Sequence, residues 1–260
     1  MHTPSKPNKT KVLLNFKTVS KANISDGARE FLAKLGLGNE PEILFYHTLS
    51  VLHSLNYREE SSGALRQDWP RVPLPKSREA LLASAELGKK VAVLLDTEDS
   101  VQGVTSGKVR PELVKTSVVT RLTRDTLNLS LTSGWGHAGQ NGVTMPGKGK
   151  IETRGYTAEE LEALQGVDLS LLGTATHDIF LNESACWRNV PAKVWEYTIG
   201  GYQVMKKWLS YREHALLGRA LTTDEAREVT HMARRIAALL LLQPELDRSY
   251  QAVKAATVPL

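Results

Sequence analysis

The stretch Asp178–Glu213, DIFLNESACWRNVPAKVWEYTIGGYQVMKKWLSYRE, decides how the rest of the chain is interpreted. It holds three of the five tryptophans, three of the seven tyrosines and the only cysteine, Cys186. Aromatic side chains bury large, rigid surfaces, and Trp and Tyr also carry a polar tip that needs a partner. We therefore expect this stretch to form the centre of the core, with the other segments packed around it.

The same stretch divides into several pieces. A short apolar run, Asp178–Asn182, comes before a loop that contains aromatic residues and arginine, Trp187–Pro191. The next segment, Val194–Ile199, is strand-like in composition. Gly200 and Gly201 then predict a turn that leads into a helix.

The first part of the chain carries mainly helix signals. Residues 1–11 are rich in Pro and Lys, which is typical of a flexible lead, and Val12–Phe16 is a short apolar run that fits an edge strand. Ser25 is placed to cap a helix over Ala28–Leu35. We expect Ile43–Leu95 to be mostly helical, because its apolar residues recur at three- and four-residue steps.

One segment of this helical part has two interpretations. The apolar residues after Ser77 fit one face of a helix that reaches Leu95 and contains Gly88. Alternatively, the helix ends at Gly88, and Val91–Leu95 is a buried strand. Periodicity does not separate the two.

The middle of the chain, from Thr97 to Tyr156, loses the helix signals and is rich in Gly, Thr, Ser and Val. Val118–Leu122 and Leu127–Leu131 flank four polar residues and predict a hairpin. The segment SGWGHAGQNGVTMPGKGK, Ser133–Lys150, predicts a glycine-rich loop, with a strand at Ile151–Tyr156 leaving it.

Two further helices follow from capping boxes, in which a Ser or Thr and a Glu three residues later satisfy each other's backbone N–H groups. The two pairs are Thr157 with Glu160 and Thr222 with Glu225. The sequence thus predicts an α+β fold, with helical N- and C-terminal parts around a central, irregular β segment that carries the glycine-rich loop. We expect a mainly helical lobe at residues 12–96 and a β-containing lobe with C-terminal helices at residues 97–260, or both in one compact domain.

Three long segments, in order along the chain, resemble a known family. They are ILFYHTLSVLHSLNYREESSGALRQDWPRVPLP (Ile43–Pro75), the opening stretch Asp178–Glu213, and Glu225–Tyr250 with its RRIAALLLLQPELDRSY end. They are similar to the C-terminal specificity region of Type ISP restriction-modification enzymes, which are bacterial single-polypeptide adenine-N6 DNA methyltransferases. The first segment looks like the part that follows the methyltransferase core in such enzymes. The resemblance also favours the long helix that ends at Leu95.

The resemblance implies a target-recognition domain. Such a domain binds double-stranded DNA and positions it for a methyltransferase core in the same polypeptide or complex, which this chain lacks. S-adenosylmethionine would belong to that core, and helicase and nuclease modules could accompany it. Residues 97–260 would then be the recognition lobe, and the protein would act in the bacterial cytoplasm.

The motifs that methylation itself requires are missing from the chain. An adenine-N6 methyltransferase of the kind it resembles holds the flipped base with an Asn/Asp-Pro-Pro-aromatic motif, and no Pro-Pro dipeptide occurs. Gly134, Gly136 and Gly139 match the letters of a GxGxxG motif. That motif binds a cofactor only where a strand precedes it and a helix follows, and neither is expected here. We therefore predict no cofactor in this chain and no catalytic activity for the chain alone.

Composition narrows the possible classes of protein. The 260 residues are 41% hydrophobic and 23% charged, as in ordinary globular domains. No run of about 18 apolar residues predicts a membrane span, and no apolar segment follows the basic N-terminus as in a secretory signal. A single cysteine suits a reducing cytosol. The net charge of +5 fits a surface that faces phosphates, although a basic protein of any other function would show it too.

Hydrolytic chemistry is poorly supported. The dipeptide His177-Asp178 could be half of a metal site, but one histidine needs further ligands, and a junction between elements explains it as well. An acidic loop could form a nuclease-like carboxylate cluster or simply be solvated: Asp96, Glu98 and Asp99, with Lys108. Cys186 lies between apolar neighbours and fits a small buried residue rather than a nucleophile. We assign no catalytic residue and no metal ligand.

DNA recognition remains, and it needs two kinds of side chain. Polar side chains read base edges, while Lys and Arg contact phosphates. The candidate base-reading residues, from the glycine-rich loop and from the Trp187–Pro191 segment, are Trp135, His137, Gln140, Asn141, Arg188 and Asn189. The candidate phosphate contacts are Lys108, Arg110, Arg121, Arg124, Lys148, Lys150, Lys206 and Lys207.

Each set has a purely structural alternative. The glycine-rich loop could be a disordered surface loop, and Arg188 could pair with Glu183 or Glu196 to hold its own loop. Lys206 and Lys207 could be the solvated side of a helix. For the whole chain, the alternatives to a DNA-recognition domain are a freestanding, nuclease-like DNA-processing enzyme and a module that docks another protein of the same system.

Overall fold

The computed structural model of the chain describes residues 22–258. The flexible lead at residues 1–11 and the edge strand expected at Val12–Phe16 lie outside these residues. The chain divides into two compact units, Met1–Pro41 and Glu42–Leu260. In the first unit, helix α1 spans Asp26–Lys34, and the Ser25 hydroxyl accepts a hydrogen bond from the Ala28 N–H at 3.2 Å, so the predicted cap is confirmed.

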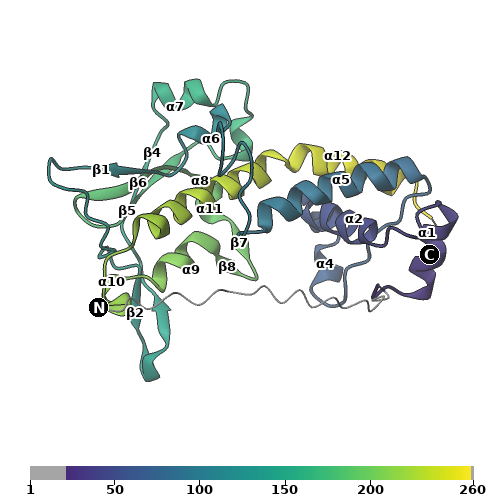
Figure 1. Cartoon of the computed structure of the whole chain (residues 1–260), viewed down its shortest axis with the longest axis horizontal. Helices are drawn as coiled ribbons and strands as arrows, with labels where there is room; N and C mark the ends of the chain where they lie inside the picture. Colours follow the sequence, from purple (N-terminus) through teal and green to yellow (C-terminus); the bar gives the residue numbers. More distant parts are fainter. Residues whose placement is uncertain (1–21, 259–260) are drawn as a thin grey trace, which may run out of the picture. The chain divides into compact units, whose positions relative to one another are not determined.

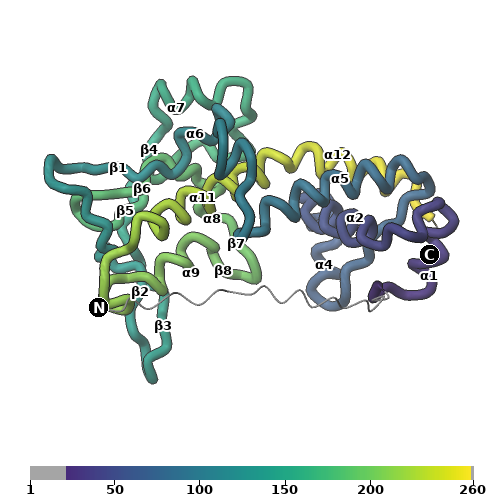
Figure 2. Tube along the Cα trace, in the orientation of Figure 1, coloured from purple at the N-terminus to yellow at the C-terminus, as the bar shows by residue number. Residues whose placement is uncertain are grey.

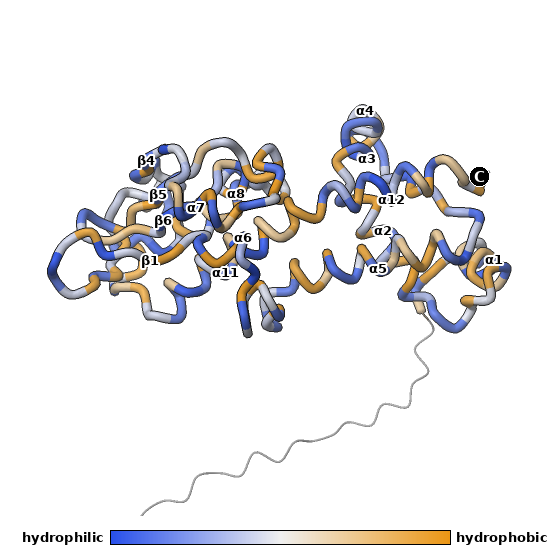
Figure 3. Tube along the Cα trace, turned by 90° about the horizontal axis from the view of Figure 1, so that it is seen from above, coloured by the Kyte–Doolittle hydropathy of each residue, from blue (hydrophilic) through white to orange (hydrophobic). Residues whose placement is uncertain are grey.

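The second unit begins with helices. These are α2 (Glu42–His53), α3 (Leu55–Glu60), α4 (Ser62–Leu65) and α5 (Arg78–Leu95), and the C-terminal helix α12 (Gln243–Ala255) packs against α2, α3 and α5. Helix α5 continues through Gly88, so the long helix is confirmed and the strand expected as its alternative at Val91–Leu95 is wrong. Along α5, apolar and polar positions alternate, as the orange and blue bands in Figure 3 show.

The close approach of α2 to α5 explains why Gly88 stands inside a helix. A Cβ atom built on Gly88 would lie 1.7 Å from the backbone oxygen of Tyr46 in α2. The two helix backbones therefore approach each other more closely at this point than any other residue would allow.

The second unit also contains a four-stranded antiparallel sheet. Its strands are β1 (Val118–Arg121), β4 (Ile151–Arg154), β5 (Thr176–Phe180) and β6 (Ala185–Pro191), in the order β1-β6-β5-β4. Two expectations are wrong here. The supposed loop Trp187–Pro191 is most of strand β6, and β1 pairs with β6 rather than with Leu127–Leu131. A pairing partner so distant in the sequence leaves no local signal.

The segment after β6 also differs from expectation. The strand expected at Val194–Ile199 is wrong, because helix α8 covers Ala192–Glu196 and only the two-residue strand β7 (Thr198–Ile199) follows. Strand β7 pairs with β8 (Tyr202–Gln203) across the predicted Gly-Gly turn, and helix α9 covers Val204–Ser210.

The remaining helices and 3₁₀ turns complete the helical part of the α+β fold. They are α6 (Pro111–Val114), α7 (Ala158–Ala163), α10 (His214–Leu217), α11 (Thr223–Leu241) and the 3₁₀ turns η1 (Gln140–Gly142) and η2 (Leu169–Leu171). Both predicted capping boxes are present, Thr157–Glu160 at α7 and Thr222–Glu225 at α11. No helix within residues 22–258 has the length and apolar character needed to cross a bilayer.

The Asp178–Glu213 stretch forms much of the core, as expected. Ile179, Trp187 and Leu209 are among its fully buried side chains. The indole N–H of Trp187 donates to the backbone oxygen of Ala226 in α11 at 3.1 Å, which satisfies its polar tip. Helix α11 lies against α8, β1 and β6, and Figures 1 and 2 show it beside the sheet.

Candidate nucleic-acid interface

The glycine-rich segment is an ordered hairpin. Strand β2 (Gly136–Ala138) pairs with β3 (Thr144–Pro146), and the hairpin projects from the body of the protein, downward in Figures 1 and 2. Its tip closes through a hydrogen bond from the Gly139 N–H to the Val143 oxygen at 2.8 Å. Asn141 at the tip has a positive φ of 59°, a conformation that Asn tolerates better than most residues. The alternative of a disordered loop is not what the structure shows.

A buried carboxylate holds the base of this hairpin. Glu213, which follows α9, accepts hydrogen bonds from the N–H groups of Gly134 at 3.2 Å and Trp135 at 2.8 Å. Trp135 itself is fully buried, and its indole N–H donates to the Phe180 oxygen at 2.8 Å. A Cβ atom on Gly136 would lie 1.9 Å from the Ser210 oxygen, so this glycine lets the hairpin pack directly on the end of α9.

A groove of about 600 Å³ lies between the hairpin and α9, and we name it the hairpin groove. Its lining comes from the hairpin, the β7–β8 turn and the α9 region: Val143, Thr144, Met145, Pro146, Gly201, Tyr202, Gln203, Lys206, Lys207, Ser210 and Tyr211. This lining contains two lysines and no carboxylate. The Lys207 ammonium lies 3.8 Å from the centre of the Tyr202 ring, a cation–π contact.

Three of the candidate base-reading residues are exposed on the hairpin: His137 in β2, and Gln140 and Asn141 at the tip. A side-chain amide carries both donors and acceptors, so Gln and Asn can match the edge of an adenine. These three predicted residues lie on the hairpin, whereas Lys206 and Lys207 line the groove between the hairpin and α9, which none of the three lines.

Two other candidates are buried. Trp135 has no exposed surface, and Asn189 is 4% exposed. The Asn189 side chain accepts a hydrogen bond from the Thr176 hydroxyl at 2.8 Å and donates one to the Lys115 oxygen at 3.1 Å. Both residues support the elements around them and present no surface to a base in this conformation.

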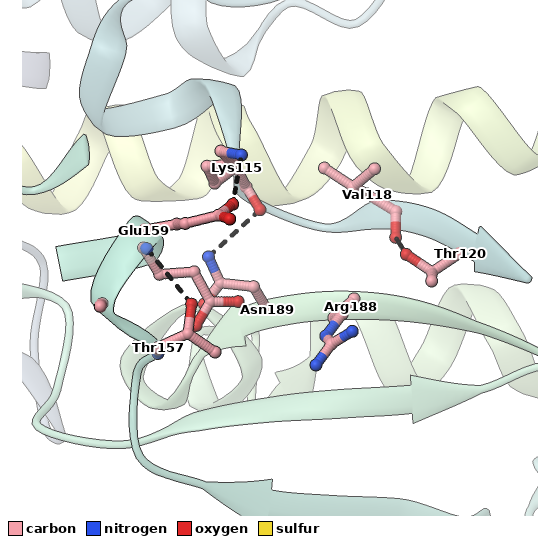
Figure 4. Close-up of a pocket in the computed structure, with 9 residues that line it drawn as sticks. Lys115, Val118, Thr120, Thr157, Glu159, Arg188 and Asn189 are labelled. Atoms are coloured by element: carbon pink, nitrogen blue, oxygen red, sulfur yellow. Dashed lines mark hydrogen bonds and ion pairs between the residues drawn. The ribbon is translucent and has the colours of Figure 1, made fainter. Parts of the chain in front are cut away.

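Arg188 lies at a second hollow, a pocket of about 500 Å³. Figure 4 shows its guanidinium across this pocket from Thr157 and Glu159. The structural alternative for Arg188 is an ion pair with Glu183 or Glu196, and the structure shows neither pair. Arg188 instead lies 3.9 Å from a carboxylate oxygen of Asp178.

A buried ionic network lies under this pocket. Arg154 donates two hydrogen bonds to Glu160, both at 2.8 Å, and two to Asp178, both at 3.0 Å. Burial alone would raise the pKa of Glu160, but hydrogen bonds from Arg154 and Thr157 outweigh it and lower that pKa. The hydrogen bonds that Arg154 makes to Glu160 and Asp178 raise its own pKa. The ion pair between Arg154 and Glu160 is therefore charged on both sides at neutral pH.

The other predicted phosphate contacts are distributed over several parts of the surface. Arg110 pairs with Glu112 at 3.4 Å, Arg121 donates to the Asp125 oxygen at 3.1 Å, and Lys150 lies 4.4 Å from the centre of the Phe180 ring. Lys108, Arg124 and Lys148 are exposed. None of these six lines the hairpin groove.

Some of the residues considered for hydrolytic chemistry have structural partners. The backbone oxygens of Asp96 and Asp99 accept hydrogen bonds from Arg235, and the His177 ring lies 2.9 Å from the Thr153 hydroxyl. Cys186 is buried, and burial raises the pKa of its thiol to about 11. Within residues 22–258, no group of three or more His, Cys, Asp or Glu side chains is arranged to hold a metal ion.

Sequence reasoning missed several residues of these sites. Glu213 contacts Gly134 and Trp135 far along the chain, so no local pattern marks it. Arg154 pairs with the nearby Glu160 but also with Asp178 on another strand, and no sequence pattern links these three residues. Tyr202 and Tyr211 could have been found, since exposed tyrosines near a basic pair are typical of binding surfaces. Their exposed fractions are 60% and 52%.

Comparisons with known proteins give one family and several solved structures, two of which follow. The profile of the family described as "Type ISP C-terminal specificity domain" matches residues 3–239. A nuclease-deletion mutant of the Type ISP restriction-modification enzyme LlaGI, solved with a DNA substrate mimic, is 16% identical with a TM-score of 0.41, and the match covers 80% of this chain and 16% of that one. A DrdV–DNA complex is 15% identical with a TM-score of 0.45, and the match covers 90% of this chain and 20% of that one. The curated proteins include no match.

Proposed function

This chain belongs to the family of Type ISP C-terminal specificity domains, and from that membership we propose that it recognises duplex DNA for a restriction-modification enzyme. In this role the chain selects the DNA site, and a methyltransferase core outside the chain flips and methylates an adenine with S-adenosylmethionine. The core would belong to the same polypeptide or complex, in the cytoplasm of a bacterium.

The hairpin and the hairpin groove are the observation that carries this proposal. The major groove of B-DNA admits a two-stranded β-ribbon, and the β2–β3 hairpin is such a ribbon with exposed polar side chains at its tip. In our proposal Gln140 and Asn141 read base edges, with His137 beside them. Trp135 and Asn189 are left out of the reading set, because they are buried.

Lys206 and Lys207 supply the phosphate contacts next to the hairpin. They line a groove without carboxylates, so a DNA strand would meet no like charge there. Phosphate contacts give affinity and fix the register of the protein on the duplex, whereas base contacts give specificity. Lys148, just after β3, is placed along the chain to extend this set. Contacts by Lys108, Arg110, Arg121, Arg124 and Lys150 remain separate predictions.

A selection experiment tests the proposal. The chain is incubated with a pool of randomised duplexes of about 25 base pairs, and bound DNA is amplified and sequenced over several rounds. We expect one enriched sequence, bound at least roughly a thousandfold more tightly than a scrambled duplex. Binding of a methyltransferase core with no enrichment of any DNA sequence would instead identify a docking module.

Hairpin variants show where the sequence is read. Gln140→Ala and Asn141→Ala should weaken binding to the enriched duplex but leave binding to the scrambled duplex unchanged. Gln67→Ala and Gln165→Ala, at exposed positions outside the hairpin, are the matched surface controls, because they too leave the charge unchanged. Equal behaviour of the hairpin variants and the controls would place the reading surface elsewhere.

A further inference from the structure

Strand β6 exposes one side chain only. Six of its seven residues, Ala185–Pro191, are buried, which means that both faces of the strand are covered. The exception is Arg188, whose side chain is 47% exposed at the pocket of about 500 Å³. An arginine in the middle of an otherwise buried strand is held by a rigid backbone, unlike a residue on a loop.

The guanidinium of Arg188 has N–H donors that make no hydrogen bond within residues 22–258. Its one partner among residues 22–258 is Asp178, at 3.9 Å, which is within ion-pair range but too long for a hydrogen bond. Arg154 already occupies the Asp178 carboxylate with two bonds of 3.0 Å. The N–H groups of Arg188 are therefore free to meet acceptors on a ligand.

The backbone and the network under the pocket set the direction of this side chain. The register between β5 and β6 shifts between the pairs His177–Val190 and Ile179–Trp187, so Arg188 and Asn189 of β6 together lie opposite Asp178. Such a bulge re-aims side chains of the bulged strand, here β6. Asp178 also accepts the Asn189 N–H at 2.9 Å. Asn189 has a positive φ of 62°, and its two side-chain hydrogen bonds hold it in this conformation directly after Arg188.

The charges around the pocket indicate what Arg188 would contact. The lining contains Lys115 and Arg188 but also Glu159 and Glu160, and Lys115 is paired with Glu159 at 3.1 Å. A DNA phosphate would be repelled by two carboxylates here, so the mixed charge disfavours a contact with the DNA backbone. A base edge carries no net charge and meets no such repulsion.

We propose that Arg188 is a specificity-determining residue that reads a guanine through the O6 and N7 acceptors of its major-groove edge, and that Asp178 is the positioning residue that presets it. Bidentate Arg–guanine pairs are the commonest specific contact to DNA. The proposal rests on the proposed function and adds a second reading point, on the sheet, to the hairpin.

The test uses the chain with the duplex enriched from the randomised pool and with duplexes carrying each single base-pair change. At one G·C position, Arg188→Ala and Arg188→Lys should bind the enriched duplex and the duplexes changed at that base pair equally well. The preference for G·C over the other base pairs there should fall by roughly 10- to 100-fold. Arg188→Lys keeps the positive charge and removes the planar fork, so its binding to scrambled duplex should stay unchanged. Arg227→Ala, an exposed arginine paired with Asp224, is the matched control.

The positioning role has its own readout. Asp178→Asn should weaken discrimination at the same base pair and should add nothing in the Arg188→Ala background. If Asp178→Asn lowers the melting temperature below the assay range, Asp178→Glu replaces it, since glutamate keeps the negative charge that pairs with Arg154 but is one methylene longer, which displaces the carboxylate beside Arg188.

The possible outcomes separate the two proposals. Unchanged discrimination at every base pair in Arg188→Ala and Arg188→Lys overturns the reading role while hairpin recognition stands. A uniform loss of affinity over all sequences in both variants identifies a structural role and overturns it too. Failure of the wild-type chain to enrich any duplex overturns the proposed function itself.

Discussion

At the scale of single residues, the arginine network under the sheet pocket matters most. Arg154 satisfies two carboxylates whose residues are 6% and 8% exposed, those of Glu160 and Asp178. Such carboxylates cost free energy to bury unless a partner stays in place. The network thus combines the capping box of α7 with strands β4 and β5, and its loss affects several elements at once.

We expect Arg154→Met to lower the free energy of unfolding by about 3 kcal/mol, because it leaves both carboxylates without their charged partner. Methionine keeps much of the side-chain volume, so packing changes little. Urea unfolding followed by tryptophan fluorescence measures the loss. The exposed pair Arg227–Asp224 provides the control, since Arg227→Met should cost less than about 1 kcal/mol. Losses of the same size in both variants would refute the network's role.

At the scale of elements, the contact between α2 and α5 is unusually close. Gly88→Ala places a methyl group where the Tyr46 oxygen lies, and we expect a loss of about 1–3 kcal/mol as the helices move apart. In an isolated helix the same change would be stabilising by up to about 1 kcal/mol. A Cβ atom on Gly63 in α4 would meet no other atom within 4 Å. Gly63→Ala therefore measures the stabilising effect of alanine in a helix without a steric clash. Melting temperatures of the two variants should therefore move in opposite directions.

The same helix pair carries a buried histidine. The Nε2 of His47 in α2 lies 2.9 Å from the Pro73 oxygen, which can only accept, so Nε2 carries the proton. Nδ1 then accepts from the Ser84 hydroxyl at 2.9 Å. Burial lowers the pKa of His47 below 6.5, and the hydrogen bond to Pro73 only partly opposes this.

A pKa that is lower in the folded state predicts a loss of stability in acid. Below about pH 6.5 the unfolded chain binds a proton that folded His47 does not, so the free energy of unfolding should fall as the pH is lowered. His47→Gln should flatten this dependence in part, because burial lowers the pKa values of His53, His177 and His231 as well. Urea titrations at several pH values measure it. An unchanged pH dependence in the variant would mean that His47 is not involved.

How much of these elements the sequence predicts depends on the distance over which each signal acts. Both capping boxes are predictable, because their signals lie within a few residues. The full length of α5 follows from the family resemblance, because the periodicity after Gly88 fits a helix and a strand equally well. Most of strand β6 has the composition of a loop, since Arg188 and Asn189 interrupt its apolar run. Its pairing with β1 brings Val118 to Arg188, and such a register follows only from the assembled sheet.

The candidate sites follow the same rule. The hairpin residues Gln140 and Asn141 are adjacent in sequence, and a glycine-rich segment marks them. The lysines of α9 are recognisable as basic residues, but their place in the hairpin groove depends on the Glu213 contact to Trp135. The division into a helical lobe at 12–96 and a recognition lobe at 97–260 remains a prediction.

At the scale of the whole molecule, the net charge of +5 is too small to explain DNA binding by itself. What distinguishes the hairpin groove is the placement of its charges, two lysines without a carboxylate, next to a ribbon that presents polar side chains. By contrast, the pocket at Arg188 has balanced charges. In our proposals the hairpin and its groove supply phosphate contacts and base reading side by side, and Arg188 adds a second reading point.

The salt dependence of duplex binding tests this account most directly. Fluorescence anisotropy with the enriched duplex should show the logarithm of the binding constant falling linearly with the logarithm of the salt concentration, by about 0.9 for each phosphate contact. In the variant with both Lys206→Ala and Lys207→Ala, the magnitude of this slope should fall by up to roughly two, one for each lysine, and the sequence preference should stay unchanged. A wild-type slope near zero, or a slope unchanged in the double variant, would contradict DNA recognition through the hairpin groove.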